Sequence, residues 1–332
     1  MTKESNINLR NDIDETELMD EKALKIIASH LDNRLFGAMI PMKPEIKIKS
    51  HLSNDFPTTF IGPIQLLPTI SLHDVLIDET QITSPFRDPG EKQSDAGNLG
   101  MKYTVRYGLY MGTGIYNPVR GKVFKTSADD LAEFDRAMVH ASSTLRTSTK
   151  TWCQTIAYLR VFFNENTGNG FRNLASGISV KTITEELPNN HQDVRLNISK
   201  LVDRLKQDDI KAVKSYVAGY AKELYSDLNL LNFSSIEDVE EKENELCCEY
   251  IWITEVRYSN LNGDPMNENR PRILEGTSIG FATPERYKRW VRDYVELNGQ
   301  PIFVSRNIPR QSASQRLIGL LGIDRSKEKS EV

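Results

Sequence analysis

Apolar residues that recur every three or four positions predict the helices of this chain. Their spacing predicts a helix over residues 15–31, marked by Leu18, Leu24, Ile27 and Leu31, whereas residues 1–13 are polar and are expected to be frayed. A second helix is predicted from residue 128 to about 145, since Ser127 or Thr126 suits an N-cap and acidic residues follow. Further helices are predicted at residues 199–228, 284–297 and 311–322.

Alternating or continuous apolar runs predict the strands. The clearest run is residues 247–258, in which Tyr250, Trp252, Val256 and Tyr258 share one face and Glu249, Glu255 and Arg257 share the other. Shorter strands are predicted at residues 34–40, 45–49, 61–77 with a break near Pro68, 103–116, 156–163 and 178–183. Residues 84–100 are rich in turn formers and predict a long loop, which is often functional.

Composition is that of a globular protein of one large domain or two ordinary ones, with 332 residues, 39% hydrophobic and 27% charged. No apolar run approaches the roughly 20 residues that span a bilayer, and no signal-peptide core follows Met1. Cys247 and Cys248 are adjacent and Cys153 is distant, which excludes a disulfide framework. We therefore expect a cytoplasmic protein that contacts no membrane.

The net charge of −4 conceals a strong asymmetry along the chain. Residues 12–21 carry six acids and no base, and residues 237–249 carry seven acids against Lys242 alone. Residues 285–316 carry seven bases against three acids. Because an anionic polymer responds to the local field, this basic stretch permits RNA binding on an acidic protein.

Polar and basic residues after the clearest strand suggest a binding loop. Gly263 permits a left-handed turn, Asn260 and Asn262 offer side-chain hydrogen bonds, and Arg270 and Arg272 can fork onto phosphates. The alternative is a surface turn with solvated charges. Tyr103 and Tyr107 alternate with cations, Lys102 and Arg106, which suits base stacking and phosphate contact but equally an ordinary exposed strand.

The predicted helix at residues 284–297 gathers cations near its start, where the helix dipole favours anions. The alternative is internal pairing, because Arg289 with Asp293 and Arg292 with Glu296 stand four residues apart. An apolar stripe on this helix is expected to be core rather than a stacking platform; it comprises Tyr287, Trp290, Val291 and Tyr294.

Sequence signatures of common enzymes are missing. The chain has no GxxxxGK[ST], HExxH or GxSxG motif and no GxGxxG after a strand. Its histidines lack metal-ligand spacing, and His73 and His140 are expected to be structural. We therefore expect no catalytic residue, no metal and no cofactor.

A set of short motifs carries a family resemblance. The chain has an Asn-x-Asn-Gly-Asp-Pro loop, an Asn-x-Pro-Arg segment and a basic helix at residues 260–265, 269–272 and 287–295. Other motifs stand at residues 34–38 (Arg-Leu-Phe-Gly-Ala), 62–65 (Gly-Pro-Ile-Gln), 71–73, 107–110 (Tyr-Gly-Leu-Tyr), 117–118 and 128–131. Together they resemble the CRISPR-associated Cascade backbone subunit ("Cas seven") of the RAMP superfamily, nearest to its type I-B and I-C branches.

Motif order differs from that family, whose opening block lies here at residues 247–305, after its closing block at 31–185. The resemblance implies an α+β fold, a modified RRM/ferredoxin-like (RAMP) palm with inserted finger and thumb elements, circularly permuted. New ends are best placed in exposed segments. The implied organisation is an N-terminal thumb-side arm and helix (1–30), the second part of the palm (31–228), an acidic linker (229–246), the first strand, loop and basic helix (247–310), and a C-terminal helix and tail (311–332).

The function implied by the resemblance is that of a non-catalytic antiviral-defence scaffold. Copies would stack head to tail along a guide RNA (crRNA), with other Cascade-type subunits, and the guide would pair with target nucleic acid. RNA contacts carried over by motif are Asn260, Asn262, Gly263, Arg270, Arg272, Arg286, Lys288, Arg289, Arg292, Lys102, Arg106 and Arg34. The alternatives are a metal-dependent target-RNA endonuclease of type III-like character that uses Asp264, with Glu268, and a filament protein without nucleic acid.

Overall fold

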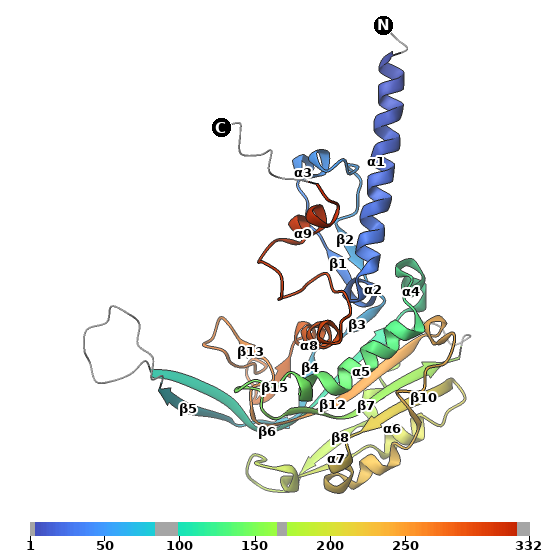
Figure 1. Ribbon diagram of the computed structural model, residues 1–332. Coiled ribbons are helices and arrows are strands. Elements are labelled where there is room, and N and C mark those ends of the chain that lie inside the picture. The colour runs from blue at the N-terminus through green and yellow to red at the C-terminus, as the bar shows by residue number, and fades with distance from the viewer. Residues whose placement is uncertain (1–3, 84–98, 165–170, 324–332) are drawn as a thin grey trace, which may run out of the picture.

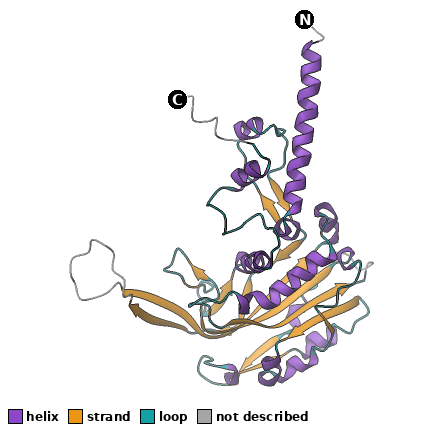
Figure 2. Cartoon of the chain, in the orientation of Figure 1, coloured by secondary structure: helices purple, strands orange, loops and turns teal. Residues whose placement is uncertain are grey.

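A large mixed sheet forms the body of the protein in the computed structural model, which describes residues 4–83, 99–164 and 171–323 (Figures 1 and 2). The predicted loop at residues 84–100 lies outside these ranges as far as residue 98. The sheet contains β3 (Ile64–Leu66), β4 (Thr69–Asp74), β5 (Ile77–Thr83), β6 (Leu99–Tyr116), β7 (Cys153–Phe163), β10 (Ile210–Val217), β11 (Ser234–Ser235), β12 (Cys248–Ser259) and β15 (Ile279–Ala282).

The strands follow the order β11-β10-β7-β12-β6-β4-β15, and β3 and β5 also pair with β6. Neighbours are antiparallel, except that β10 and β11 are parallel. This arrangement of a mixed sheet with helices confirms the α+β class.

The clearest predicted strand, β12, occupies the centre of the sheet and pairs along its length with both β6 and β7. Tyr250, Trp252 and Val256 lie in one core cluster, as predicted. Tyr258 does not, because a positive φ of 43° turns its side chain out to 62% exposure. Glu255, predicted on the opposite face, is fully buried there and accepts hydrogen bonds from Tyr225 and Trp152.

Helices α5 (Ala128–Thr144) and α8 (Pro284–Leu297) cover one face of the sheet (Figure 1). Ser127 caps α5 in a capping box with Asp130, which confirms the predicted start. Tyr287 of α8 packs against the sheet residue Trp252, and Trp290 packs against Tyr287 in the same core cluster, so the apolar stripe of α8 is core.

Residues 174–205 and 218–231 cover the opposite face, which is also apolar. This layer contains η2 (Leu174–Gly177), β8 (Ser179–Thr182), η3 (His191–Asp193), β9 (Val194–Asn197), α6 (Ser199–Arg204), α7 (Gly219–Leu224) and η4 (Ser226–Leu230). The helix predicted over residues 199–228 is therefore wrong, because β10 interrupts it. Pairing of β10 with β7 outweighs the helical period of that segment.

The N-terminal segment departs furthest from expectation. Helix α1 (Glu4–Ser29) includes most of the segment expected to be frayed, since residues 4–29 contain no Gly or Pro. The strand predicted at residues 34–40 is confirmed only in its second half: the first three residues end helix α2 (Leu31–Phe36), and β1 (Gly37–Met39) is extended and paired with β2 (Thr59–Ile61). The strand predicted at 45–49 is α3 (Pro44–Lys49), which Pro44 starts at the first helical position.

The two ends of the chain share a third apolar cluster. Leu317 and Leu321, in and just after α9 (Ala313–Leu320), pack with Ala23 and Ile27 of α1. The Nζ atom of Lys22 donates a hydrogen bond to the Leu321 carbonyl, at 3.2 Å. Helix α1 projects away from the sheet beyond this contact (Figure 1). None of the described helices is both long and apolar enough to cross a membrane.

The acidic segment predicted as a linker is packed into the fold. It contains β11 and η5 (Glu243–Glu245), and Glu243 is only 4% exposed. The Glu243 carboxylate lies 3.1 Å from the buried Arg160 guanidinium and also pairs with Lys214. Part of its acidity therefore neutralises buried cations.

Candidate nucleic-acid interface

The loop that follows β12 is a small hairpin built from β13 (Gly263–Asp264) and β14 (Arg270–Pro271). The Asn260 amide donates to the Asn269 carbonyl at 2.7 Å, and Asn260 is buried. Asn262 accepts the backbone N–H of Thr283 at 2.8 Å and so fixes the start of α8. A Cβ atom on Gly263 would lie 2.0 Å from the Asn269 side chain. These three residues, which the sequence predicted as RNA contacts, therefore shape the hairpin and connect it to the start of α8.

Arginines of the hairpin have partners inside the protein. Arg270 lies over the Tyr103 ring, 4.1 Å from its centroid, and pairs with Glu79 at 2.8 Å. Arg272 pairs with Asp264 at 3.0 Å. Their positive charges are thus largely balanced within the chain, although Arg270 remains partly exposed.

Two of the four cations of α8 also serve the fold. Arg289 pairs with Asp293, as the four-residue spacing predicted, and donates to the Val304 carbonyl at 3.2 Å. Arg292 does not pair with Glu296. Its Nε atom donates to Asp32 at 3.0 Å, and the same carboxylate accepts the Phe303 N–H.

Lys288 points its ammonium at the Phe36 ring, with Nζ 5.8 Å from the ring centroid. Burial lowers the pKa of its ammonium group. Among the residues that the structure describes, no carboxylate forms an ion pair with Lys288. It therefore remains available for an anion.

The remaining predicted contacts lie far apart in the sequence, and each forms hydrogen bonds within the protein. Arg34 forms a bidentate pair with Asp130, at 2.7 and 2.8 Å. Arg106 pairs with Asp78 and donates to Asn189 at 3.0 Å. Lys102 donates to the Ser148 carbonyl at 2.9 Å. Arg34 and Arg106 consequently have a structural role in this fold.

A basic cavity lies where the end of α5 approaches the start of α8. It has a volume of about 490 Å³ and is lined by four cations, Arg146, Lys150, Arg286 and Arg306. We call it the basic pocket. Of these, only Arg286 was predicted as a contact. Arg306 belonged to the basic stretch recognised in the sequence, and Arg146 and Lys150 gave no signal beyond their charge.

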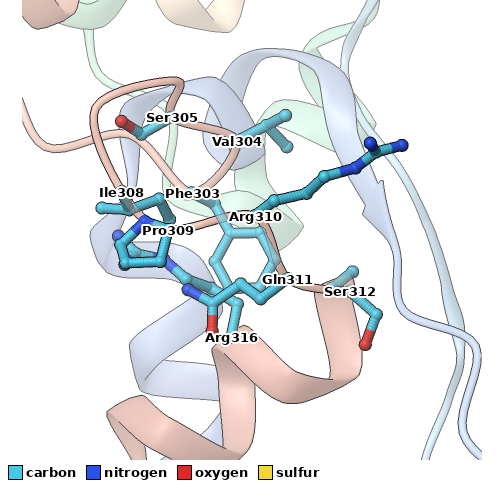
Figure 3. Close-up of a pocket in the computed structure, with 10 residues that line it drawn as sticks. Phe303, Val304, Ser305, Ile308, Pro309, Arg310, Gln311, Ser312 and Arg316 are labelled. Atoms are coloured by element: carbon cyan, nitrogen blue, oxygen red, sulfur yellow. The ribbon is translucent and has the colours of Figure 1, made fainter.

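A second cavity of about 200 Å³ follows along the segment between α8 and α9 (Figure 3). Arg310 and Arg316 line it together with Phe303, Ile308 and Pro309. Residues 305–316 contain three arginines and no acid. The segment thus extends positive charge from the basic pocket towards α9.

The carboxylates of the endonuclease alternative are engaged in the hairpin. Asp264 accepts hydrogen bonds from Arg272 and from the Met266 N–H, and Glu268 accepts one from Tyr103 at 2.9 Å. Within the described ranges, no three His, Cys, Asp or Glu side chains come together as a metal site. The alternative stays a prediction from the sequence.

Comparison with known proteins identifies relatives of the chain. A family model described as "CRISPR-associated protein Cas7" matches residues 2–199 and 247–331. A protein of Haloferax volcanii with that same description is 33% identical over 70 residues. This alignment covers 21% of the chain and 21% of the relative.

Proposed function

The chain belongs to the CRISPR-associated protein Cas7 family, and we propose that it is a crRNA-binding backbone subunit of a CRISPR effector complex. Copies would polymerise head to tail along the guide RNA with other subunits of the complex, and the guide would pair with target nucleic acid. The subunit would be a non-catalytic, cytoplasmic scaffold. The observation that carries this proposal is the family match, which extends over both separated segments of the chain.

We further propose that the fold is a circularly permuted RRM-like palm. Strands β12 and β4 are both antiparallel to β6, which lies between them, and β6 and β7 are both antiparallel to β12. Helix α5 connects β6 to β7, and α8 follows β12 on the same face. A chain that began at β12 would read β12-α8-β4-β6-α5-β7, which is the β-α-β-β-α-β order of a ferredoxin-like fold.

The contact between α9 and α1 is compatible with the permutation. The two helices are far apart in the sequence but share one apolar cluster, so a connection between them would be short. Permutation is tolerated when the original ends can be joined and the new ones fall in an exposed region. Residues 229–246 would be the joint, and the family match omits residues 200–246. Residues 1–30 and 311–332 would then form the thumb side.

Exposed arginines favour RNA as the polymer that the subunit holds. Arg306 and Arg310 lie on the segment after α8 and are exposed, and no acid stands between residues 305 and 316. Contacts of this kind bind the phosphate backbone without reading the sequence. This is the property that a holder of guides of different sequence requires.

The decisive experiment is to co-express the chain with the genes beside its own, purify it at mild salt and sequence the RNA that accompanies it. We expect an RNA of uniform guide length whose ends derive from the repeat. Protein that is free of RNA at the same salt would contradict the proposal. Incubation of the purified complex with complementary RNA and Mg²⁺ tests the endonuclease alternative, for which Asp264→Ala must abolish any cleavage seen.

A further inference from the structure

The structure assigns the basic pocket, which Arg146, Lys150, Arg286 and Arg306 line, as a site for one phosphodiester group of single-stranded RNA. The assignment rests on the proposed function and names a place at which it is carried out. Three of these cations were not among the contacts predicted from the sequence.

Charge in the pocket is poorly balanced. Within the described part of the chain, no carboxylate forms an ion pair with Arg146, Lys150 or Arg286. Asp293 is the carboxylate in the pocket wall, and it pairs with Arg289 and lies 3.7 Å from Arg306. Three cations thus face one cavity without a counter-charge, which is the condition that an anion would relieve.

Arg286 is held in a fixed orientation. Its guanidinium lies over the Trp290 ring, 4.2 Å from the centroid, and Nε has no hydrogen-bond partner among the described residues. Burial, with a smaller contribution from Arg306, lowers the pKa of this guanidinium to about 10, so it is still charged at neutral pH. A planar, oriented guanidinium matches the two oxygens of a phosphodiester.

The charged form of Lys150 is also destabilised by burial and by a neighbouring positive charge. Burial lowers the pKa of its ammonium, and the charge of Arg286 adds to this effect. A bound phosphate would favour the protonated form of Lys150 and offset the repulsion between the two cations. A bound anion therefore stabilises the charged pocket electrostatically in a way that water does not.

Size and surroundings favour a polymer over a free ion. At about 490 Å³ the cavity is much larger than one phosphate needs. Positive charge continues along the chain from Arg306 to Arg310 and Arg316. The last two line the second cavity (Figure 3). Acidic side chains of another copy, such as those of α1, would be the competing occupant, and the test below distinguishes the two.

The test measures binding of the full-length chain to a fluorescein-labelled single-stranded RNA of guide length. Fluorescence anisotropy reports the affinity at salt concentrations from about 50 to about 300 mM, because the number of phosphate contacts is obtained from the salt dependence. The test variant is Arg146→Gln with Lys150→Gln, because neither side chain makes a hydrogen bond that another described residue depends on. Its control is Arg120→Gln with Lys122→Gln on α4 (Pro118–Phe124), two exposed cations near the other end of α5.

Loss of the pocket should weaken binding about tenfold and reduce the slope of log K against log salt by about 0.7, the value for one phosphate on a single strand. The control should retain the wild-type slope. Arg286→Lys should weaken binding in part, since it keeps the charge and loses the fork.

Each other result has a defined meaning. Equal affinity and equal salt slope for the test variant and the wild type would overturn the assignment of the pocket as a phosphate site and would leave the proposed function intact. If wild-type protein itself fails to bind the RNA, both fall. If the test variant binds RNA normally but loses self-association by light scattering, the pocket receives an acidic segment of another copy, which also overturns the assignment.

Discussion

Glu243→Gln tests whether the acidic segment before β12 is a loose connection or part of the core. Glu243 is 4% exposed, and its carboxylate pairs with Arg160 and Lys214, which are themselves buried. Glutamine keeps the size of the side chain and removes its charge. Arg160 would keep Asp135 at 3.0 Å, whereas Lys214 would lose its ion partner.

Removal of one member of a buried ion pair costs about 3–5 kcal/mol, because the remaining charge stays desolvated. Arg160 retains one carboxylate, so we expect the lower end, about 3 kcal/mol. For a chain of 332 residues, unfolding entropy of roughly 2.1 cal/mol/K per residue converts this loss into a decrease of about 4 °C in Tm.

The assay is thermal unfolding followed by circular dichroism, with Glu241→Gln as the control. Glu241 is exposed, belongs to the same acidic segment and should change Tm by less than about 1 °C. Equal shifts for the two variants would refute the reasoning, because they would show that the buried ion pairs of Glu243 contribute no more stability than the exposed charge of Glu241.

Three further outcomes are expected. Ser127→Ala removes the capping box of α5 and should lower stability by about 1 kcal/mol in denaturant unfolding, with Ser148→Ala as an exposed control. Gly263→Ala places a Cβ against Asn269 and should cost about 1–3 kcal/mol, more than Gly219→Ala, where the added Cβ meets open space. Burial raises the pKa of Cys153 to about 12, so the stability that its neutral thiol contributes is complete below about pH 8.5, the unfolded value, and is lost as pH rises towards 12. Cys153→Ser should flatten the decline of the urea midpoint over that window, and an unchanged decline would contradict the assignment.

Local signals in the sequence located the central elements well. The apolar run of β12, the cap of α5 at Ser127 and the Thr283-Pro284 start of α8 each depend on residues close together in the chain, and the structure has all of them. Where the apolar pattern covered only a few residues, it predicted the wrong type of secondary structure. The alternation at residues 45–49 is also compatible with a helical turn, and Pro44 decided between the two.

Partners of charged residues could not be read in the same way. Arg34 finds Asp130 at a separation of 96 residues, and Arg292 finds Asp32 at 260 residues. In the sequence, a cation that pairs with an acid far along the chain cannot be told apart from a cation that is free to bind RNA. The basic pocket was missed for the same reason, since Arg146 and Arg286 meet only because α5 and α8 pack together.

Burial of both sides of the central sheet limits how this protein can meet a nucleic acid. An RRM reads single-stranded RNA by laying bases on aromatic rings at an open sheet surface. Here the rings of Tyr107, Tyr158 and Trp252 are all at or near zero exposure, beneath one covering layer or the other. No base can reach them in this fold. A guide RNA held as proposed would therefore lie outside the sheet, on the helices, loops and margins around it, where every guide sequence presents the same sugar–phosphate outline.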